Sequence, residues 1–390
     1  MTEPPLLNRR FIRLQAVQRL YAFYVCKKAN HAWALDQIRD YFVPDVFADP
    51  PIAKDQLDQE AQRAMAMFVN SIKSLSPFYT SLDLPSSRVG KVVAHVLASY
   101  QHELAKDVRR LEEGLQEAVT KINQACIRIW QLLVEWAHIA NKQLERPESN
   151  QQYTPHVSMW LSHSYVLQHL QSDVELTKLV RQESVGWGEH LPLVVSWYDQ
   201  LVKKGMAVQC RLAHPITPAQ DQQLLRTLLE NIILGEETIQ SFFSDLDLQW
   251  STHKRIVKRV VRQGLLQCVK GSTKGCGSSL PDLSACWEQE RYFYTDLVRK
   301  TLQKDEELEG LIAEKSENWA LDRIMLLDKT IIKLALCEMV HFPHIPTKVS
   351  INEYIDLSRT YSMPQSSQFV NGLLDAVAAT LSAKGAGTEA

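Results

Sequence analysis

The first residues of this sequence that could do chemistry are three arginines near its start. Arg9, Arg10 and Arg13 open a predicted helix. Cations at a helix N-terminus oppose the helix macrodipole, each at a cost of up to ~1 kcal/mol. A bound ligand with negative charge would explain why the arginines are placed there. A solvated arginine cluster is the alternative interpretation, and the sequence leaves both open.

A second group of cations lies on a helix predicted for residues 252–264. Its apolar residues form the opposite, buried side, and the segment contains no acidic residue that could pair with the cations. Such a stripe suits the phosphates of a nucleic acid. The alternative is a solvated helix side that is paired with acids from elsewhere in the fold. The five cations are Lys254, Arg255, Lys258, Arg259 and Arg262.

Catalytic and metal sites have weaker support. The sequence contains neither G-x-G-x-x-G nor G-x-x-x-x-G-K-[ST], the phosphate-binding patterns of dinucleotide and P-loop proteins. Cys268, Cys276 and Cys286 surround a Gly/Ser-rich loop, but they lack C-x2-C spacing and a nearby histidine pair. No Ser/His/Asp arrangement stands out. We therefore expect no catalysis, no metal and no cofactor.

The segment Ile345–Asp375 combines apolar helical spacing with unusual polar residues. A polar turn precedes Phe369. Asn371 and Gly372 follow inside the same predicted helix, although both are poor helix formers. We expect Gly372 to permit close contact with a neighbouring helix, and Asn371 to bond to a neighbouring backbone or to Asn352. The residues alone do not decide between pure packing and a binding surface.

Helical periodicity dominates the chain and indicates an all-α fold. Polar or Gly/Ser-rich connections at residues 143–155 and 270–285 separate the helical regions, and the second is the clearest boundary. Further helical segments lie between them. The other predicted helices cover residues 8–28, 55–82, 86–110, 111–145, 287–313, 319–340 and 349–360. Pro364 breaks the chain, and a last helix begins at Ser366 or Ser367, with its apolar positions at Phe369, Val370, Leu373, Leu374 and Val377.

Composition limits the location and partners of the chain. It has 390 residues and a net charge of -2, so any binding to nucleic acid must come from local patches. Seven scattered cysteines indicate reduced thiols and a cytoplasmic location. The N-terminus lacks the apolar stretch of a signal peptide, and no apolar run is long enough to span a bilayer. We expect no membrane partner.

Two motifs at opposite ends of the chain resemble the NusB family of bacterial transcription antitermination factors. Members carry IP-x-KVAINEA-(I/V)-ELAK, a short loop, and then S-x-x-FVNG-(V/I)-LD. This chain has IPTKVSINEYIDLSR, TYSMPQ and SSQFVNGLLD. Its N-terminal RRFIRLQAVQRLYAF is similar to the arginine-rich first helix of the family, R-x-x-A-x-Q-x-L-Y.

The resemblance implies a NusB-like helical bundle with a large helical insertion. Residues 1–30 would form the first helix of the bundle, and residues 286–384 its C-terminal core. Residues 31–285 would be a helical insertion or an extended subdomain, for which the family gives little guidance. Residues 385–390 would be a disordered tail.

The resemblance also implies a function. Members bind the boxA element of nascent ribosomal RNA together with NusE, a ribosomal protein, and join an antitermination complex on RNA polymerase. The stripe on residues 252–264 would add further RNA contacts. Carried over by motif position, Arg9, Arg10 and Arg13 would contact RNA phosphates, Gln18 and Tyr21 would lie on or beside the same helix side, and Gln365, Ser366 and Phe369 would flank the RNA and the partner.

The chain departs from the family pattern at two positions. Gln365 replaces an aspartate that many relatives have in the loop, and Phe11 replaces a third arginine of the basic opening. RNA affinity would then depend more on NusE or on the cationic stripe. Gln365 and the enlarged middle of the chain leave open a helical interaction scaffold that kept the fold without RNA binding. An enzyme with a NusB-like accessory module would need a glycine-rich α/β domain downstream, whereas the sequence ends shortly after Lys384.

Overall fold

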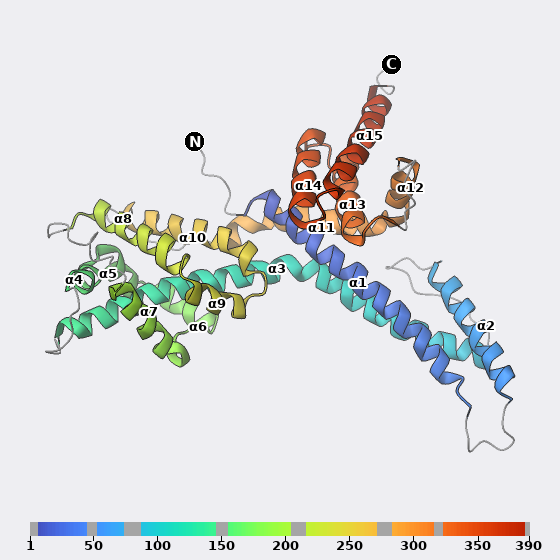
Figure 1. Ribbon diagram of the computed structural model, residues 1–390, viewed down its shortest axis with the longest axis horizontal. Helices are drawn as coiled ribbons and strands as arrows, with labels where there is room; N and C mark the ends of the chain where they lie inside the picture. The colour runs from blue at the N-terminus through green and yellow to red at the C-terminus, as the bar shows by residue number, and fades with distance from the viewer. Residues whose placement is uncertain are drawn as a thin grey trace. The chain divides into compact units, whose positions relative to one another are not determined.

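The computed structural model confirms the all-α fold class: its described part contains helices and no strand (Figure 1). The structure describes residues 7–44, 53–73, 87–145, 155–203, 216–270, 283–315 and 323–386. The helices are α1 (Arg9–Tyr41), α2 (Lys54–Lys73), α3 (Arg88–Glu145), α4 (Pro155–His163), α5 (Tyr165–Gln171), α6 (Val174–Gln182), η1 (Gly188–His190), α7 (Leu191–Lys203), α8 (Pro218–Leu228), η3 (Leu229–Ile233), α9 (Glu237–Leu246), α10 (Trp250–Lys270), α11 (Leu283–Gln303), α12 (Asp305–Lys315), α13 (Leu326–His341), α14 (Thr347–Tyr361) and α15 (Ser366–Ala386).

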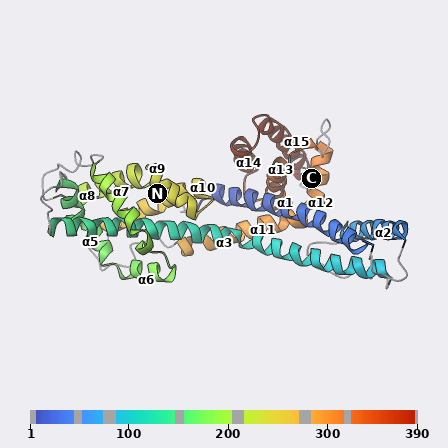
Figure 2. The same cartoon turned by 60° about the horizontal axis from the view of Figure 1, so that its bottom comes forward.

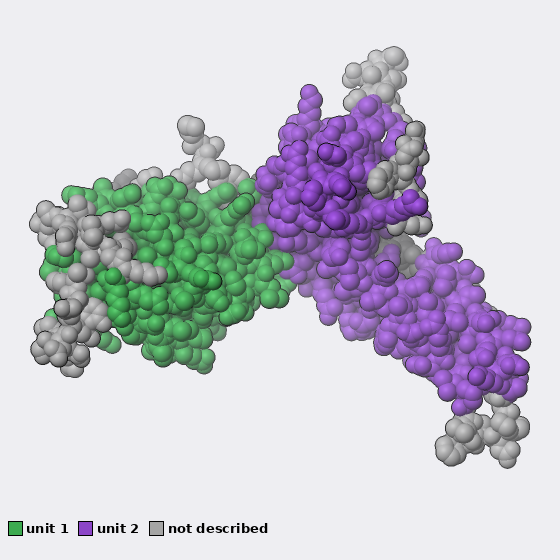
Figure 3. All heavy atoms as spheres, viewed as in Figure 1, with its two compact units in different colours: residues 1–8, 116–288 green, residues 9–115, 289–390 purple. Residues whose placement is uncertain are grey.

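The chain divides into two compact units (Figure 3). Unit 1 comprises residues 1–8 and 116–288, and unit 2 comprises residues 9–115 and 289–390. Residues 31–115, which the sequence grouped with the middle of the chain, therefore belong to the same unit as the C-terminal helices. The upper division at residue 288 lies close to the boundary expected at residue 285.

Helix α13 is the central helix of unit 2. Residues 331–339 are all buried, and α13 packs against α1, α12, α14 and α15. Apolar side chains occur around most of its circumference, so neighbouring helices must cover it on all sides, which explains this central place. In α15 the predicted apolar positions Val370, Leu373, Leu374 and Val377 are buried, as expected for the side that faces α13 and α14.

A second core of unit 2 lies where α2 packs beside α1 and the first part of α3 (Figure 2). Ile38, Phe42, Leu57, Phe68 and Val96 are buried in it. The α1 helix thus continues to Tyr41, well past the predicted end at residue 28. The long α1 is stabilised at its C-terminal end by this tertiary packing rather than by local sequence.

Helix α3 is one continuous helix of 58 residues, where the sequence pattern predicts two. The expected break at residues 110 and 111 falls in a charged stretch without proline, and the helical hydrogen bonds run through it. Gly114 lies there for a packing reason. A Cβ atom at this position would come within 2.9 Å of the Arg19 side chain, so glycine leaves room for that side chain of α1 against α3.

The helix predicted for residues 287–313 is interrupted in the structure. Helix α11 ends at Gln303 and α12 begins at Asp305, with three acidic residues in its first turn. Acids at a helix N-terminus favour the start of a new helix because they complement its dipole. The Gly/Ser-rich boundary falls largely on residues 271–282, outside the described ranges.

Unit 1 is built around the second part of α3, whose Trp130 and Trp136 side chains are fully buried. A buried carboxylate connects the short helices beside it. Asp221 of α8 accepts hydrogen bonds from Trp160 Nε1 at 2.9 Å, Ser164 Oγ at 2.9 Å and the Val166 amide at 3.1 Å. Among the described helices, none has the length and apolar character that a bilayer crossing needs.

Candidate nucleic-acid interface

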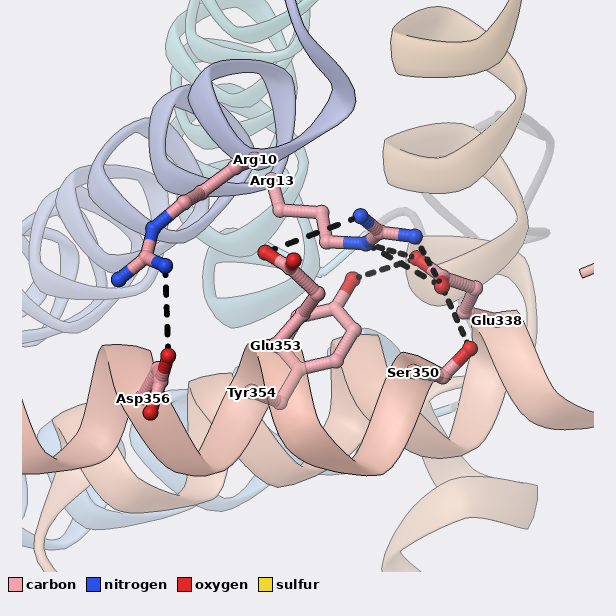
Figure 4. Close-up of polar contacts among 7 residues, drawn as sticks. All are labelled: Arg10, Arg13, Glu338, Ser350, Glu353, Tyr354 and Asp356. Atoms are coloured by element: carbon pink, nitrogen blue, oxygen red, sulfur yellow. Dashed lines mark hydrogen bonds and ion pairs between the residues drawn. The ribbon is translucent and has the colours of Figure 1, made fainter. Parts of the chain in front are cut away.

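Arg13 and Glu338 form a buried ion pair between α1 and α13 (Figure 4). Their side chains are 3% and 0% exposed. Arg13 donates two parallel bonds, from Nη2 to Oε1 at 2.7 Å and from Nε to Oε2 at 2.9 Å. This two-point geometry is the strongest that an arginine and a carboxylate adopt. It fixes the N-terminal helix on the central helix of unit 2.

Helix α14 completes the hydrogen bonding of Glu338. Ser350 Oγ donates to Oε1 at 2.6 Å, and the Tyr354 hydroxyl donates to Oε2 at 3.1 Å. Burial and the Glu338 charge raise the Tyr354 pKa well above its usual value. Burial acts to lower the Arg13 pKa, but the hydrogen bond and charge of Glu338 outweigh it, so the net shift is upward.

The interior position of Arg13 separates it from the other two arginines of the opening. Arg9 and Arg10 are exposed. Arg10 Nη1 lies 3.3 Å from Asp356 Oδ2 of α14, with both side chains nearly half exposed (Figure 4). Contact between Arg13 and RNA stays a prediction, and it would require a phosphate to replace Glu338 as the partner of this guanidinium. Arg9 and Arg10 can reach a phosphate without such a rearrangement.

The other residues expected on the first helix lie one to two turns further along. Gln18 is half-buried, and its Oε1 accepts a bond from Gln15 Nε2 at 3.3 Å. Tyr21 is 38% exposed, which leaves an aromatic edge available on the surface. Arg10 and Tyr21 therefore both present polar or aromatic groups to solvent from α1.

The C-terminal candidates lie where α14 turns into α15. Gln365 is exposed in this turn, Ser366 is the first residue of α15, and Phe369 is half-buried. The Ser366 amide donates to the Met363 carbonyl at 2.9 Å, which closes the turn. Arg10 contacts Asp356 on the helix that leads into this turn. The structure thus brings the two ends of the sequence together on α1 and α14.

The Asn371–Gly372 pair does not serve packing, so the expectation of close helix contact at Gly372 is wrong. Both residues are exposed, and a Cβ atom at Gly372 would meet nothing within 4 Å. Asn371 Nδ2 donates to Asp375 Oδ2 at 3.2 Å, rather than to Asn352 or a neighbouring backbone. Two poor helix formers on an exposed side cost helix stability without any packing gain in the chain itself.

The cationic stripe belongs to unit 1, on α10. Lys258 Nζ and Arg262 Nη1 lie 3.7 and 3.9 Å from the same Glu230 oxygen in η3. Arg226 of α8, which the sequence pattern does not single out, lies 3.4 Å from that oxygen. Burial, and secondarily the charge of Lys258, lower the pKa of Lys254. An acid from another element thus partly neutralises the stripe, but one carboxylate faces three cations.

Three residues of this region, Glu338, Asp356 and Phe293, were not predicted from the sequence. Glu338 is the acid within the buried residues 331–339 that pairs with Arg13, and an acid inside this mostly apolar stretch is the signal that could have found it. Arg9 Cζ lies 5.2 Å from the centroid of the Phe293 ring. The described residues contain no group of three or more histidine, cysteine or acidic side chains suited to a metal ion, and Cys276 lies outside them.

Comparisons with known proteins agree with this arrangement. The model of the NusB family matches residues 277–379, which include α13, α14 and most of α15. The transcription antitermination protein NusB of Geobacter sulfurreducens is 31% identical over 135 residues, covering 33% of this chain and 98% of that relative. The chain belongs to the NusB family.

Other NusB relatives match a shorter stretch. The transcription antitermination protein NusB of Chloroherpeton thalassium is 37% identical over 93 residues, covering 24% of this chain and 44% of its own length. The protein of the same name from Salinibacter ruber is 38% identical over 87 residues, covering 22% and 54%. The chain spans about half the length of these two NusB relatives. Most of its own length lies outside the stretches matched to these NusB proteins.

Proposed function

We propose that this chain is a transcription antitermination factor that binds boxA-type RNA of nascent ribosomal transcripts together with NusE, without catalysis. The observation that carries the proposal is the contact between the two family motifs in unit 2. Arg10 on α1 contacts Asp356 on α14, the helix that leads into the Gln365 turn. The protein would act in the cytoplasm, in a complex with RNA polymerase.

The proposed RNA surface comprises the exposed and half-buried candidate residues of the two motifs: Arg9, Arg10, Gln18, Tyr21, Gln365, Ser366 and Phe369. Arg9 and Arg10 supply charge for phosphates, and Tyr21 and Phe369 supply rings on which bases can stack. The exposed Asn371–Gly372 pair supports a partner on the neighbouring part of α15, because an open glycine lets another backbone approach closely.

One observation favours a second candidate, a helical scaffold that contacts proteins but not RNA. The charges of Arg10 and Arg13 are already paired with Asp356 and Glu338. Copurification with NusE, combined with no RNA binding at low salt, would favour the scaffold. The exposure of the Arg10–Asp356 pair argues for RNA, since exposed ion pairs contribute little and exchange partners readily.

Replacing both Arg9 and Arg10 with alanine should weaken boxA RNA binding in the presence of NusE. The slope of log K against log salt should become shallower by about 1.4, the change expected when two phosphates of a single strand are no longer neutralised. Fluorescence anisotropy across a salt series measures both quantities. Arg39→Ala is the matched control, because Arg39 is an exposed arginine of the same helix. Unchanged affinity and slope would overturn the assignment of these two arginines.

The cationic stripe of α10 should add affinity that does not depend on RNA sequence. Replacing Lys254, Arg255 and Lys258 together with glutamine should weaken binding to boxA and to a scrambled RNA by the same factor. It should also reduce the salt slope by about 0.7 for each phosphate that the stripe no longer neutralises. Lys178→Gln, an exposed lysine of unit 1, is the control. A slope identical to that of the wild type would show that the stripe is only a solvated helix side.

A further inference from the structure

A groove of about 520 Å³ lies beside Arg9 in unit 2. It is formed by α11, the start of α1 and the segment at the end of α13. Arg9 belongs both to this groove and to the proposed RNA surface. The lining residues are Arg9, Tyr292, Phe293, Thr295, Asp296, Arg299, His341, Phe342 and His344.

Four of the lining residues of this groove carry aromatic side chains that the structure places near one another or at the surface: Tyr292, Phe293, Phe342 and His344. Phe293 and Phe342 are buried, and their ring centroids lie 5.5 Å apart at an interplanar angle of 80°. The His344 ring lies 6.1 Å from the ring of Phe342. Tyr292, in contrast, is 72% exposed. So exposed a ring gains little from packing within the chain, and its upper surface is open to a ligand.

Cationic side chains lie over or near these rings. The Arg9 guanidinium lies over the Phe293 ring, 5.2 Å from its centroid. Arg299 is held by Glu112, whose Oε1 accepts hydrogen bonds from Arg299 Nη2 at 2.8 Å and from Nε at 3.1 Å. Asp296 is the carboxylate among the lining residues, and it accepts a bond from Lys300 Nζ at 2.8 Å. Because Arg299 is paired with Glu112 and Asp296 with Lys300, Arg9 is the lining residue from which a ligand with negative charge would gain most.

We propose that this groove holds a nucleotide of single-stranded RNA, with its base stacked on Tyr292 and its phosphate at Arg9. The inference rests on the proposed function and deepens it, since it gives the RNA a second contact site beyond the motif residues. Exposed aromatics beside cations are the combination that binds single strands without sequence preference. A groove of this size is adequate for one nucleotide. His341 and His344 supply ring nitrogens that can bond to phosphate or base.

The test uses the full chain and two single-stranded RNAs of equal length, one with boxA and one with a scrambled sequence. Tyr292→Ala should weaken binding to both by about ten-fold, because stacking on an aromatic ring is sequence-tolerant. Tyr292→Phe should retain the affinity. Trp33→Ala is the control, since Trp33 is a 51% exposed aromatic of α1 outside the groove. His344→Asp adds a carboxylate to the lining, and it should weaken both RNAs as well.

The outcomes separate this inference from the proposed function. If Tyr292→Ala and His344→Asp bind as the wild type does while the Arg9 and Arg10 variant is weakened, the groove proposal fails and the proposed function stands. Equal wild-type affinity for the two RNAs, with a loss on Tyr292→Ala, retains the groove and refutes boxA recognition. A wild type that binds neither RNA at low salt overturns both. Self-association in sedimentation that Tyr292→Ala abolishes would assign the groove to a second copy of the chain.

Discussion

Replacing Glu338 with alanine should lower the free energy of unfolding of unit 2 by about 3–5 kcal/mol, the cost of breaking a buried ion pair from one side. The Arg13 guanidinium would stay in the interior without its two-point partner. Ser350 and Tyr354 would lose the acceptor of their hydrogen bonds at the same time. Helices α1, α13 and α14 meet at this carboxylate, so their mutual packing should loosen together.

Hydrogen exchange read by mass spectrometry measures this effect helix by helix. We expect faster exchange in α1, α13 and α14 of Glu338→Ala. Glu113→Ala, at an exposed position of α3, is the control and should change little. A double variant, Arg13→Met with Glu338→Leu, removes both charges and should recover part of the loss, because apolar replacements of a buried pair are tolerated. Exchange in Glu338→Ala at wild-type rates would contradict a structural role for the pair.

This ion pair changes the interpretation of the arginine-rich opening. From sequence, three arginines near a helix N-terminus looked like one anion-binding group. In the structure, Arg13 is an internal anchor, and the exposed Arg9 and Arg10 are placed by it. RNA binding measured on a variant that includes Arg13→Ala would therefore combine the removal of a binding group with a loss of structure. The Arg9 and Arg10 variant avoids that ambiguity.

The sequence was sufficient for the elements of unit 2 whose signals are local. The apolar spacing of Val370, Leu373 and Leu374 and the break at Pro364 predict the last helix and its buried side, and the structure confirms both. The local signals did not predict that α3 is one continuous helix. The charged residues around 110 and 111 interrupt the apolar spacing, but the stretch contains no proline and the helix continues through it.

Local sequence signals predict even less of the candidate site, because its contacts join residues that are far apart in the sequence. Arg13 and Glu338 are 325 positions apart, and each is unusual on its own helix without indicating its partner. Nothing in either segment indicates that the two side chains pair. The same holds for Arg226, Lys258 and Arg262, which converge on Glu230 from two helices. Motif resemblance could place the helices, but it could not distinguish a buried arginine from an exposed one.

Replacing Asp221 with alanine should destabilise the part of unit 1 around α4, α5 and α8 by about 3 kcal/mol, since each buried donor left unpaired costs ~1–3 kcal/mol. Trp160 Nε1, Ser164 Oγ and the Val166 amide would lose their acceptor. Hydrogen exchange should accelerate in these helices, and the exposed Asp245→Ala is the control. Unchanged exchange around Trp160 would show that water replaces the carboxylate at little cost.

The charge of Asp221 gives the same prediction a second readout. Burial raises the Asp221 pKa, although its hydrogen-bond donors act to lower it. The native state therefore binds this proton more tightly than the unfolded chain does. Stability from this group is complete below the unfolded pKa and is lost as pH rises through the raised native pKa. Urea unfolding of the wild type and of Asp221→Asn should be measured across acidic pH. The free energy of unfolding of the wild type should rise relative to that of Asp221→Asn as pH falls. A difference that is independent of pH would mean that the carboxylate is no harder to ionise in the native state.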